Sequence, residues 1–194
     1  MKLCGLTGGV GMGKSTAADF LSRRGARVVD TDELAHQLVR PGQSALAEIQ
    51  NAFGPGLLAP DGTLKREQLA GVVFADTAAR QKLEAILHPR IRAAWQAQVA
   101  QWRRENVPLA VVVIPLLFET GAENLFEKIV CAACTPAAQR ERLHARGWPD
   151  GEIARRSAAQ LPVADKITRA HFVLWTEGRL ETLARQIDIV WGRI

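Results

Sequence analysis

The sequence contains no tyrosine, and its aromatic residues, six Phe and five Trp, are scattered along the chain. Proteins that bind single-stranded nucleic acid usually interleave basic side chains with aromatic ones, on which the bases stack. No such interleaving occurs here. The formal net charge of +5 therefore favours an anionic partner such as a nucleotide without indicating a nucleic acid. A basic surface that is simply solvated is the alternative explanation of this charge.

Cysteine is scarce: Cys4, Cys131 and Cys134 cannot supply a disulfide framework, which agrees with a reducing compartment. The spacing of Cys131 and Cys134 fits a redox or metal pair. A redox pair of this kind usually opens a helix after a strand, whereas these two residues end a strand-like run. No second pair completes a zinc site. We therefore expect small, buried thiols.

Long apolar runs are also missing. The longest one beyond the N-terminal segment, residues 109–118, is far short of the roughly 20 residues of a membrane-spanning helix. At the N-terminus, Gly8 and Gly9 interrupt the apolar segment before it could form the core of a signal peptide. We expect a soluble, cytoplasmic protein without a membrane partner. The sequence does not determine its oligomeric state, and a monomer is expected.

The chain of 194 residues suits one domain in which strand-like and helical segments alternate. Such alternation predicts an α/β fold with a mainly parallel sheet and helices on both faces. The five expected strands span residues 3–6, 27–29, 109–114, 128–134 and 172–175. Residues 43–106 are mostly helical in pattern, with breaks at 54–56, at 60–62 and at His88-Pro89.

One motif points to phosphate chemistry. Gly8-x-x-x-x-Gly13-Lys14-Ser15 lies between the first strand and the first helix, where glycines let backbone N–H groups surround a phosphate and the helix adds its positive end. Lys14 is expected to bridge the β- and γ-phosphates of ATP, and the Ser15 hydroxyl is expected to bind Mg²⁺. The residues expected to contact the nucleotide are Gly9, Val10, Gly11, Met12, Gly13, Lys14, Ser15 and Thr16.

An acidic pair, Asp30 and Asp32, follows the second strand. Parallel sheets bind their ligands at the carboxyl ends of the strands, so a carboxylate here can accept the proton of an attacking hydroxyl. Alternatively, Asp32 or Thr31 simply caps the next helix. A GTP-dependent switch is excluded, because neither Asn-Lys-x-Asp nor Asp-x-x-Gly occurs.

Basic residues gather between Arg140 and Lys166. Most of these charges are expected on a solvated face. A subset is expected to stabilise the charge that spreads over the transferred phosphoryl group, as arginines on a mobile lid do.

Together these motifs resemble the dephospho-CoA kinase family, one of the P-loop nucleoside and nucleotide kinases. The residues that carry the resemblance span nearly the whole chain: 7–16, Asp30-Thr31-Asp32, Leu87-His88-Pro89, Pro115-Leu116-Leu117-Phe118-Glu119, Gln139-x-x-Arg142-x-x-x-Arg146, and Arg156-x-x-x-Gln160 with Lys166. The resemblance implies transfer of phosphate from ATP to the 3′-hydroxyl of the ribose of dephospho-CoA, the last step of coenzyme A synthesis.

The resemblance also implies a three-layer P-loop sandwich in a single kinase domain of three parts. These are a nucleotide core (1–40, 107–135 and 170–194), a helical acceptor-binding insert (43–106) and an Arg-bearing lid (139–168). Asp32 would be the general base, Lys14 the phosphate clamp and Arg142 a lid charge. The residues implied on the acceptor side are Asp30, His88, Arg92, Leu116 and Glu119.

Some of these roles have ordinary alternatives. His88 before a proline could equally pack at a helix end, and Glu119 could act through a Mg²⁺-bound water or bond the backbone. The sequence departs from the family at Met12, where Ser is commoner and the backbone is expected to act. It also departs at His171, where Asp is usual, and at 175–178, where an Asn-containing turn is usual. These last two changes are expected beside the adenine pocket. Another nucleoside or nucleotide as acceptor, or a nucleotide-binding module without turnover, remains an alternative.

Overall fold

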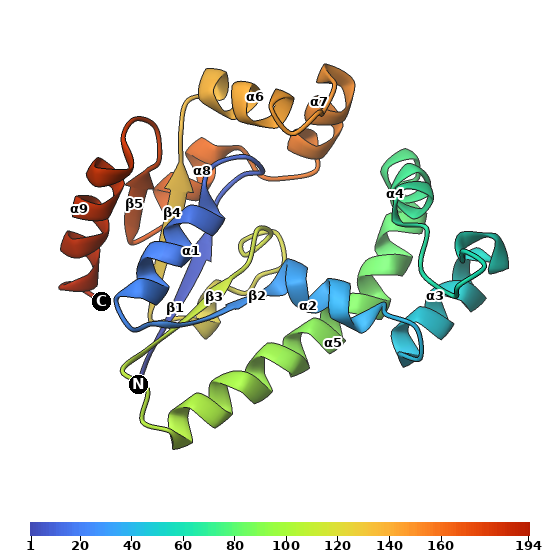
Figure 1. Ribbon diagram of the computed structural model, residues 1–194, viewed down its shortest axis with the longest axis horizontal. Helices are drawn as coiled ribbons and strands as arrows, with labels where there is room; N and C mark the ends of the chain where they lie inside the picture. Colours follow the sequence, from blue (N-terminus) through green and yellow to red (C-terminus); the bar gives the residue numbers. More distant parts are fainter. The chain divides into compact units, whose positions relative to one another are not determined.

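The computed structural model describes all residues from Met1 to Ile194. The chain divides into two compact units, the core unit (Met1–Asp30 with Val99–Ile194) and the helical unit (Thr31–Gln98). The core unit holds one sheet of five strands: β1 (Lys2–Thr7), β2 (Arg27–Asp30), β3 (Leu109–Val113), β4 (Lys128–Ala133) and β5 (Phe172–Trp175). Their order is β2-β3-β1-β4-β5 and every pairing is parallel (Figure 1). The predicted α/β fold is confirmed.

The apolar runs of the sequence become the middle of this sheet. All residues of β3 are buried, and so are those of β1 after Lys2 and those of β4 after Lys128. A strand that is covered on both faces needs apolar side chains at successive positions, not only at alternate ones. This requirement explains why residues 109–113 show no alternation of polar and apolar side chains.

Helices cover both faces of the sheet. On one face, α1 (Lys14–Arg23) and α9 (Leu180–Trp191) pack together, and Leu21 and Ile187 join a core cluster with alternate strand residues such as Val111 and Val130 (Figure 1). On the other face, α8 (Val163–Arg169) contacts β4. The remaining helices of the core unit are η2 (Glu123–Leu125), α6 (Pro136–His144) and α7 (Asp150–Ala158).

The helical unit comprises α2 (Thr31–Leu38), α3 (Ser44–Phe53), η1 (Pro55–Leu57), α4 (Arg66–Ala75) and most of α5 (Thr77–Arg104). It has its own apolar cluster, which includes Ile49, Leu57, Leu69 and Val73. The chain turns between η1 and α4 through a short antiparallel bridge of Leu58 with Leu64. The breaks predicted at 54–56 and 60–62 are therefore confirmed.

The predicted break at His88-Pro89 is wrong, because α5 continues through Pro89 to Arg104. A proline inside a helix lacks one N–H donor and costs about 3 kcal/mol. Arg90, the next residue, donates from Nη1 to the carbonyl oxygen of Ile86 at 2.7 Å and so supports the turn that precedes the proline. Buried residues farther along the helix, such as Trp95 and Val99, add packing that stabilises α5. The residues around His88-Pro89 alone do not indicate this packing.

No helix is both long enough and apolar enough to span a membrane.

Candidate active site

The phosphate loop, residues 8–13, connects β1 to α1. The Lys14 side chain turns back over the loop, and its Nζ atom donates to the carbonyl oxygens of Gly8 at 3.0 Å and Gly9 at 2.9 Å. Gly13, which precedes α1, supplies no side-chain cap, so no side chain of that residue satisfies the first N–H groups of the helix. The loop thus brings an ammonium group and the positive end of a helix to one place.

Two glycines are required by their surroundings. Gly8 has φ 143°, and a Cβ atom there would lie 2.3 Å from the carbonyl oxygen of Ala132 in β4. Gly13 has φ 83°, and a Cβ atom there would lie 2.8 Å from Oγ1 of Thr176. Because only glycine combines a positive φ with so little space, the loop approaches β4 and the segment after β5 more closely than any other residue would allow.

The loop is also held by hydrogen bonds from distant parts of the chain. Thr176 donates from Oγ1 to the carbonyl oxygen of Met12 at 3.0 Å. Gln139 donates from Nε2 to the carbonyl oxygen of Val10 at 2.7 Å, and the N–H group of Val10 donates to Oε1 of Gln160 at 2.9 Å. The side chain of Met12 is buried. The Ser15 side chain, in the first turn of α1, is exposed.

The acidic pair lies where β2 ends and α2 begins. Asp30 pairs with Val113 of β3, and Val113 pairs with Leu6 of β1, so Asp30 is at the same edge of the sheet as the phosphate loop. Asp32 is the second residue of α2 and is exposed. It follows Asp30 by two residues, so the backbone keeps the two carboxylates near the same strand end.

The turn after β3 forms an ion pair with a buried lysine of α8. Lys166 of α8 is fully buried, and its Nζ atom lies 2.6 Å from the carbonyl oxygen of Pro115 and 2.8 Å from Oε1 of Glu119. The same Oε1 atom accepts from the N–H group of Leu161 at 2.8 Å. Thr7, the last residue of β1, donates from Oγ1 to the carbonyl oxygen of Pro115 at 3.3 Å. Glu119 is therefore engaged in contacts that hold this turn at the end of the sheet.

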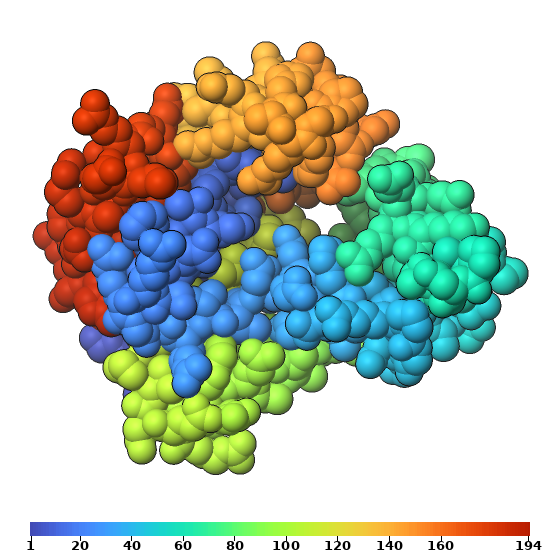
Figure 2. Space-filling view, viewed as in Figure 1, coloured from blue at the N-terminus to red at the C-terminus, as the bar shows by residue number.

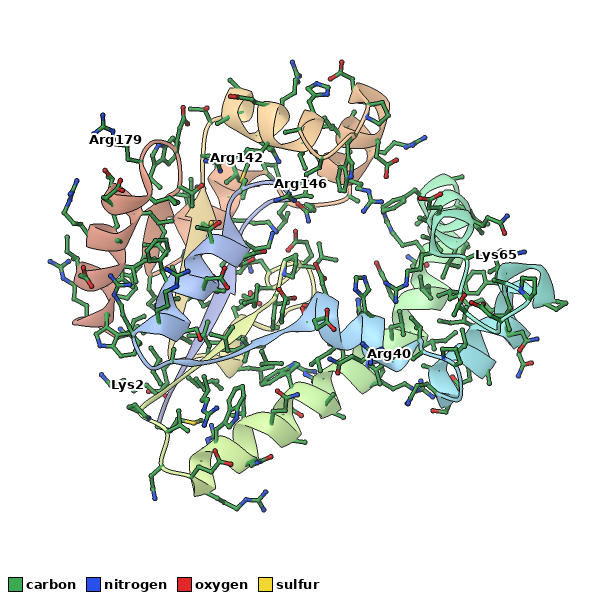
Figure 3. All side chains as sticks on the ribbon, viewed as in Figure 1. Lys2, Arg40, Lys65, Arg142, Arg146 and Arg179 are labelled. Atoms are coloured by element: carbon green, nitrogen blue, oxygen red, sulfur yellow. The ribbon has the colours of Figure 1, made fainter.

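Arg142 of α6 contacts the segment that follows β5. Its Nη1 atom donates to Oγ1 of Thr176 at 2.9 Å, and its Nη2 atom donates to the Thr176 carbonyl oxygen at 2.6 Å. Figure 3 shows Arg142 and Arg146 below α6 in that view. Arg155 and Arg156 instead bond to Glu152 one turn earlier in α7, and these hydrogen bonds lower the pKa of the Glu152 carboxyl.

His88 and Arg92 belong to the helical unit, where they lie one turn apart on α5. His88 is half-buried and Arg92 is exposed. Leu116, in the turn after β3 in the core unit, is half-buried as well. The roles predicted for these residues on the acceptor side stay predictions.

The three cysteines are buried and unpaired by disulfides, which confirms the prediction of small buried thiols. Burial raises the pKa of Cys4 to about 12 and that of Cys131 to about 11, and it also raises the pKa of Cys134. No group of three or more His, Cys, Asp or Glu side chains forms a candidate metal centre.

One expectation about adenine contacts needs correction. His171 precedes β5, and its N–H group donates to the carbonyl oxygen of Ile129, near the start of β4. Both residues therefore lie at the amino ends of the strands, whereas the phosphate loop lies at the carboxyl ends. Its Nδ1 atom accepts from the N–H group of Ile129 at 3.1 Å. Since β4 and β5 are parallel, only the turn that begins at Thr176 lies at the edge of the loop. His171 therefore plays a structural part at the far end of β5.

Sequence reasoning missed how the phosphate loop and the turn after β3 are supported. Gln139, Gln160 and Lys166 were singled out only as parts of family motifs, and Thr176 only as part of an unusual turn. Their partners lie 51 to 164 positions away in the chain, so no local pattern relates them. Uncharged amides inside an Arg-rich segment were the available signal.

The sequence matches the protein family described as dephospho-CoA kinase over residues 2–182. The dephospho-CoA kinase of Anaeromyxobacter dehalogenans is 47% identical over 189 residues, which cover 97% of this chain and 90% of that protein. The dephospho-CoA kinase of Geobacter sulfurreducens is 41% identical over 194 residues, with 100% and 98% covered.

Solved structures show the same similarity over nearly the whole chain. The structure of TT1252 from Thermus thermophilus superposes with a TM-score of 0.83 at 33% identity, covering 100% of this chain and 97% of that one. Dephospho-CoA kinase from Campylobacter jejuni gives a TM-score of 0.71 at 26% identity, with the same shares covered. Shikimate kinase from Bacteroides thetaiotaomicron, at 0.51 and 16%, shares the fold alone, over 99% and 97% of the two chains. Because the family match and these relatives span nearly the whole sequence, the chain belongs to the dephospho-CoA kinase family.

Proposed function

We propose that this chain transfers the γ-phosphate of ATP to the 3′-hydroxyl of the ribose of dephospho-CoA, giving coenzyme A and ADP. The observation that carries the chemistry is the phosphate loop with an acidic strand end at the same edge of the sheet. The choice of acceptor is supported by the full-length similarity to proteins named for this activity. Coenzyme A synthesis would end with this step.

The position of the loop supports nucleotide binding. Glycine at positions 8 and 13 lets the loop pack closely against β4 and Thr176, because a Cβ atom there would collide with them. Backbone N–H groups of the loop and of the first turn of α1 that have no partner within the protein would surround the phosphates, and the Lys14 ammonium would bridge the β- and γ-phosphates. In the structure the Lys14 ammonium contacts two loop carbonyl oxygens, and nucleotide binding would replace these contacts by contacts with phosphate oxygens.

Hydroxyl and carboxylate oxygens are the ligands that suit Mg²⁺, which usually binds one or two protein groups together with phosphates. Ser15 presents an exposed hydroxyl in the first turn of α1, beside Lys14. We assign Ser15 as the protein ligand of Mg²⁺. When bound, the ion offsets the negative charge of the β- and γ-phosphates.

The reaction itself needs a base and a stable orientation. The 3′-oxygen would form a bond to the γ-phosphorus while the bond from that phosphorus to the β,γ-bridging oxygen breaks, and ADP leaves with that electron pair. Asp32 would accept the hydroxyl proton. Its exposure at the start of α2 makes the carboxylate accessible to an acceptor.

Arg142 is proposed to stabilise the charge on the transferred phosphoryl group. It uses two donor atoms on Thr176 in this structure, and a guanidinium carries five N–H donors, so contact with a phosphate oxygen is compatible with the observed bonds. We propose residues 139–168 as the lid that carries it, residues 43–106 as the acceptor-binding insert and residues 1–40, 107–135 and 170–194 as the nucleotide core.

The acceptor side is assigned to Asp30, His88, Arg92, Leu116 and Glu119. Arg92 is exposed and permanently charged, which suits an acceptor that bears phosphates. Glu119 would act mainly by shaping the turn after β3, because its Oε1 atom already accepts from Lys166 and Leu161.

Turnover with a defined acceptor tests the proposal. The purified chain is mixed with ATP, Mg²⁺ and dephospho-CoA, and coenzyme A and ADP are quantified by mass spectrometry and by a coupled assay. A variant without the Lys14 ammonium serves as the background. Equimolar coenzyme A and ADP above that background support the proposal, and their absence contradicts it.

A panel of acceptors distinguishes the alternatives. Adenosine, AMP, other nucleosides and shikimate are offered in place of dephospho-CoA. A higher kcat/KM with any of these would make the chain a different kinase on the same fold. Salt-sensitive binding to oligonucleotides without ATP turnover would instead indicate a binding module.

A further inference from the structure

Val10, in the middle of the phosphate loop, is held by two side chains that come from different places. Its N–H group donates to Oε1 of Gln160 at 2.9 Å, and its carbonyl oxygen accepts from Nε2 of Gln139 at 2.7 Å. Gln139 lies in α6, and Gln160 lies in the turn between α7 and α8. Two amides thus hold both polar groups of one loop residue.

Val10 has no equivalent support from the backbone. The N–H group of Met12 donates to the Gly9 carbonyl oxygen, but Val10 takes part in none of the backbone hydrogen bonds of the loop. Its neighbours Gly9 and Gly11 offer the widest choice of conformations of any residue type. The two amides therefore supply the restraint that the glycines leave out.

The chemistry of the two contacts is opposite. Only an acceptor can satisfy the N–H group of Val10, and only a donor can satisfy its carbonyl oxygen. A glutamine amide offers both an acceptor and a donor, and here each glutamine presents the atom that its partner requires. The requirement fixes which end of each amide faces the loop.

The same side of α6 makes further contacts with the loop. Arg142, three residues after Gln139, bonds to Thr176, and Thr176 bonds to the carbonyl oxygen of Met12. Leu143 packs so closely that a Cβ atom at Gly11 would lie 2.8 Å from its Cγ atom. Figure 2 shows the orange atoms of α6 and α7 next to the blue atoms of the N-terminal region.

We propose that Gln139 and Gln160 are positioning residues that set the Val10 peptide groups and thereby couple α6 and the α7–α8 turn to nucleotide binding. This inference rests on the proposed kinase function for its biological meaning. The restraint prepares the loop N–H groups for phosphate before the nucleotide arrives, which lowers the ordering cost of binding. In return, a bound nucleotide stabilises the docked position of α6, because such coupling is reciprocal.

The geometry is tested first without any nucleotide. Hydrogen exchange of the Val10 amide is followed by NMR in Gln160→Met, Gln139→Met and a control, Gln101→Met, on the exposed surface of α5. Gln160→Met should speed Val10 exchange about 3- to 10-fold, the usual net effect of one hydrogen bond, and the control should not. Unchanged exchange in Gln160→Met overturns the proposal.

The role in binding is tested with charge-matched substitutions and ADP titration calorimetry. Gln139→Glu and Gln160→Glu add the same charge near the loop, but only a carboxylate at 160 keeps an acceptor for the Val10 N–H group. Gln139→Lys and Gln160→Lys reverse the comparison, because only an ammonium at 139 keeps a donor for the carbonyl oxygen. ADP should bind about tenfold more tightly to Gln160→Glu than to Gln139→Glu, and to Gln139→Lys than to Gln160→Lys.

A purely electrostatic effect would instead weaken both Glu variants and strengthen both Lys variants, and this result overturns the proposal. In steady-state assays Gln139→Glu and Gln160→Lys, which lose the required donor or acceptor, should raise the KM for ATP more than they lower kcat. Neither exchange nor ADP binding requires dephospho-CoA. Both measurements therefore test this inference even if the chain phosphorylates another acceptor. Circular dichroism identifies any variant that loses the fold. If one of the two Glu variants is lost in this way, the comparison of the two Lys variants still tests the proposal, and the converse also holds.

Discussion

The ammonium group of Lys166, which has no exposure to solvent, lies 2.8 Å from Oε1 of Glu119, whose side chain is 18% exposed. Removal of the Glu119 carboxylate would leave the fully buried Lys166 ammonium without its countercharge. Glu119→Gln should therefore lower the free energy of unfolding by about 3 kcal/mol. Urea denaturation measures the loss, and Lys2→Met, at an exposed position, should change it by less than about 0.5 kcal/mol. Equal stability of the two variants would show that the pair contributes little.

Lys14→Ala tests the phosphate loop. Loss of the ammonium that contacts Gly8 and Gly9 should lower kcat about 10²- to 10³-fold, because a preorganised positive charge is removed from the site of transfer. Thermal denaturation should show a retained fold. Activity within a few fold of that of the parent chain would mean that the loop does not bind the phosphates as described.

Asp32→Asn separates chemistry from binding. An amide cannot accept the proton of the attacking hydroxyl, so kcat should fall about 10²- to 10⁴-fold while the KM for the acceptor changes little. Asp30→Asn, at the same strand end, is the matched control and should raise KM more than it lowers kcat. If the two variants behave in the opposite way, the base is Asp30 and Asp32 binds substrate.

Gly13→Ala distinguishes a steric from a conformational requirement. Gly13 has φ 83° and a Cβ atom would meet Thr176, whereas Gly25 has φ 98° and open space around it. Gly25→Ala should cost only the backbone strain of about 1–2 kcal/mol. Gly13→Ala should cost more and should also weaken ADP binding, as calorimetry can measure. Equal losses of stability and unchanged ADP affinity would remove the steric explanation.

The thiols should be inert in the folded protein. Because burial raises the pKa of Cys131 from 9.0 to about 11, its thiolate fraction at pH 8 falls about a hundredfold. Reaction with a chromogenic disulfide should therefore be slow in buffer, and all three thiols should react at once in guanidinium chloride. Rapid reaction of one thiol in the native state would reveal an accessible cysteine.

The same shifts make alkaline conditions destabilising. The folded state keeps the protons of Cys4 and Cys131, whose pKa values are raised to about 12 and 11. The unfolded chain loses them near pH 9, so the stability they contribute is fully present below pH 9 and is lost as the pH rises toward 11–12. The midpoint of thermal unfolding should fall over this range. In Cys4→Ala the fall should be smaller, when the midpoint of each protein is compared with its own value below pH 9.

Much of the fold was predictable because it depends on local patterns. The apolar run at 109–113 is typical of a strand covered on both faces, and Gly8, Gly13 and Lys14 have spacings that serve phosphate binding. The prediction failed at Pro89, where the packing of a long helix outweighs the local cost of proline, and at His171, which lies at the other end of β5 from the loop.

By itself, then, the sequence determined the order of strands and helices, the phosphate loop and the acidic strand end, because these follow from periodicity and from the spacing of neighbouring residues. Tertiary structure alone decided which residues hold that loop. Gln139, Gln160 and Thr176 reach Val10 and Met12 across 129 to 164 positions. Hydrogen bonds form between groups that the fold brings within about 3 Å, and no separation along the chain predicts them.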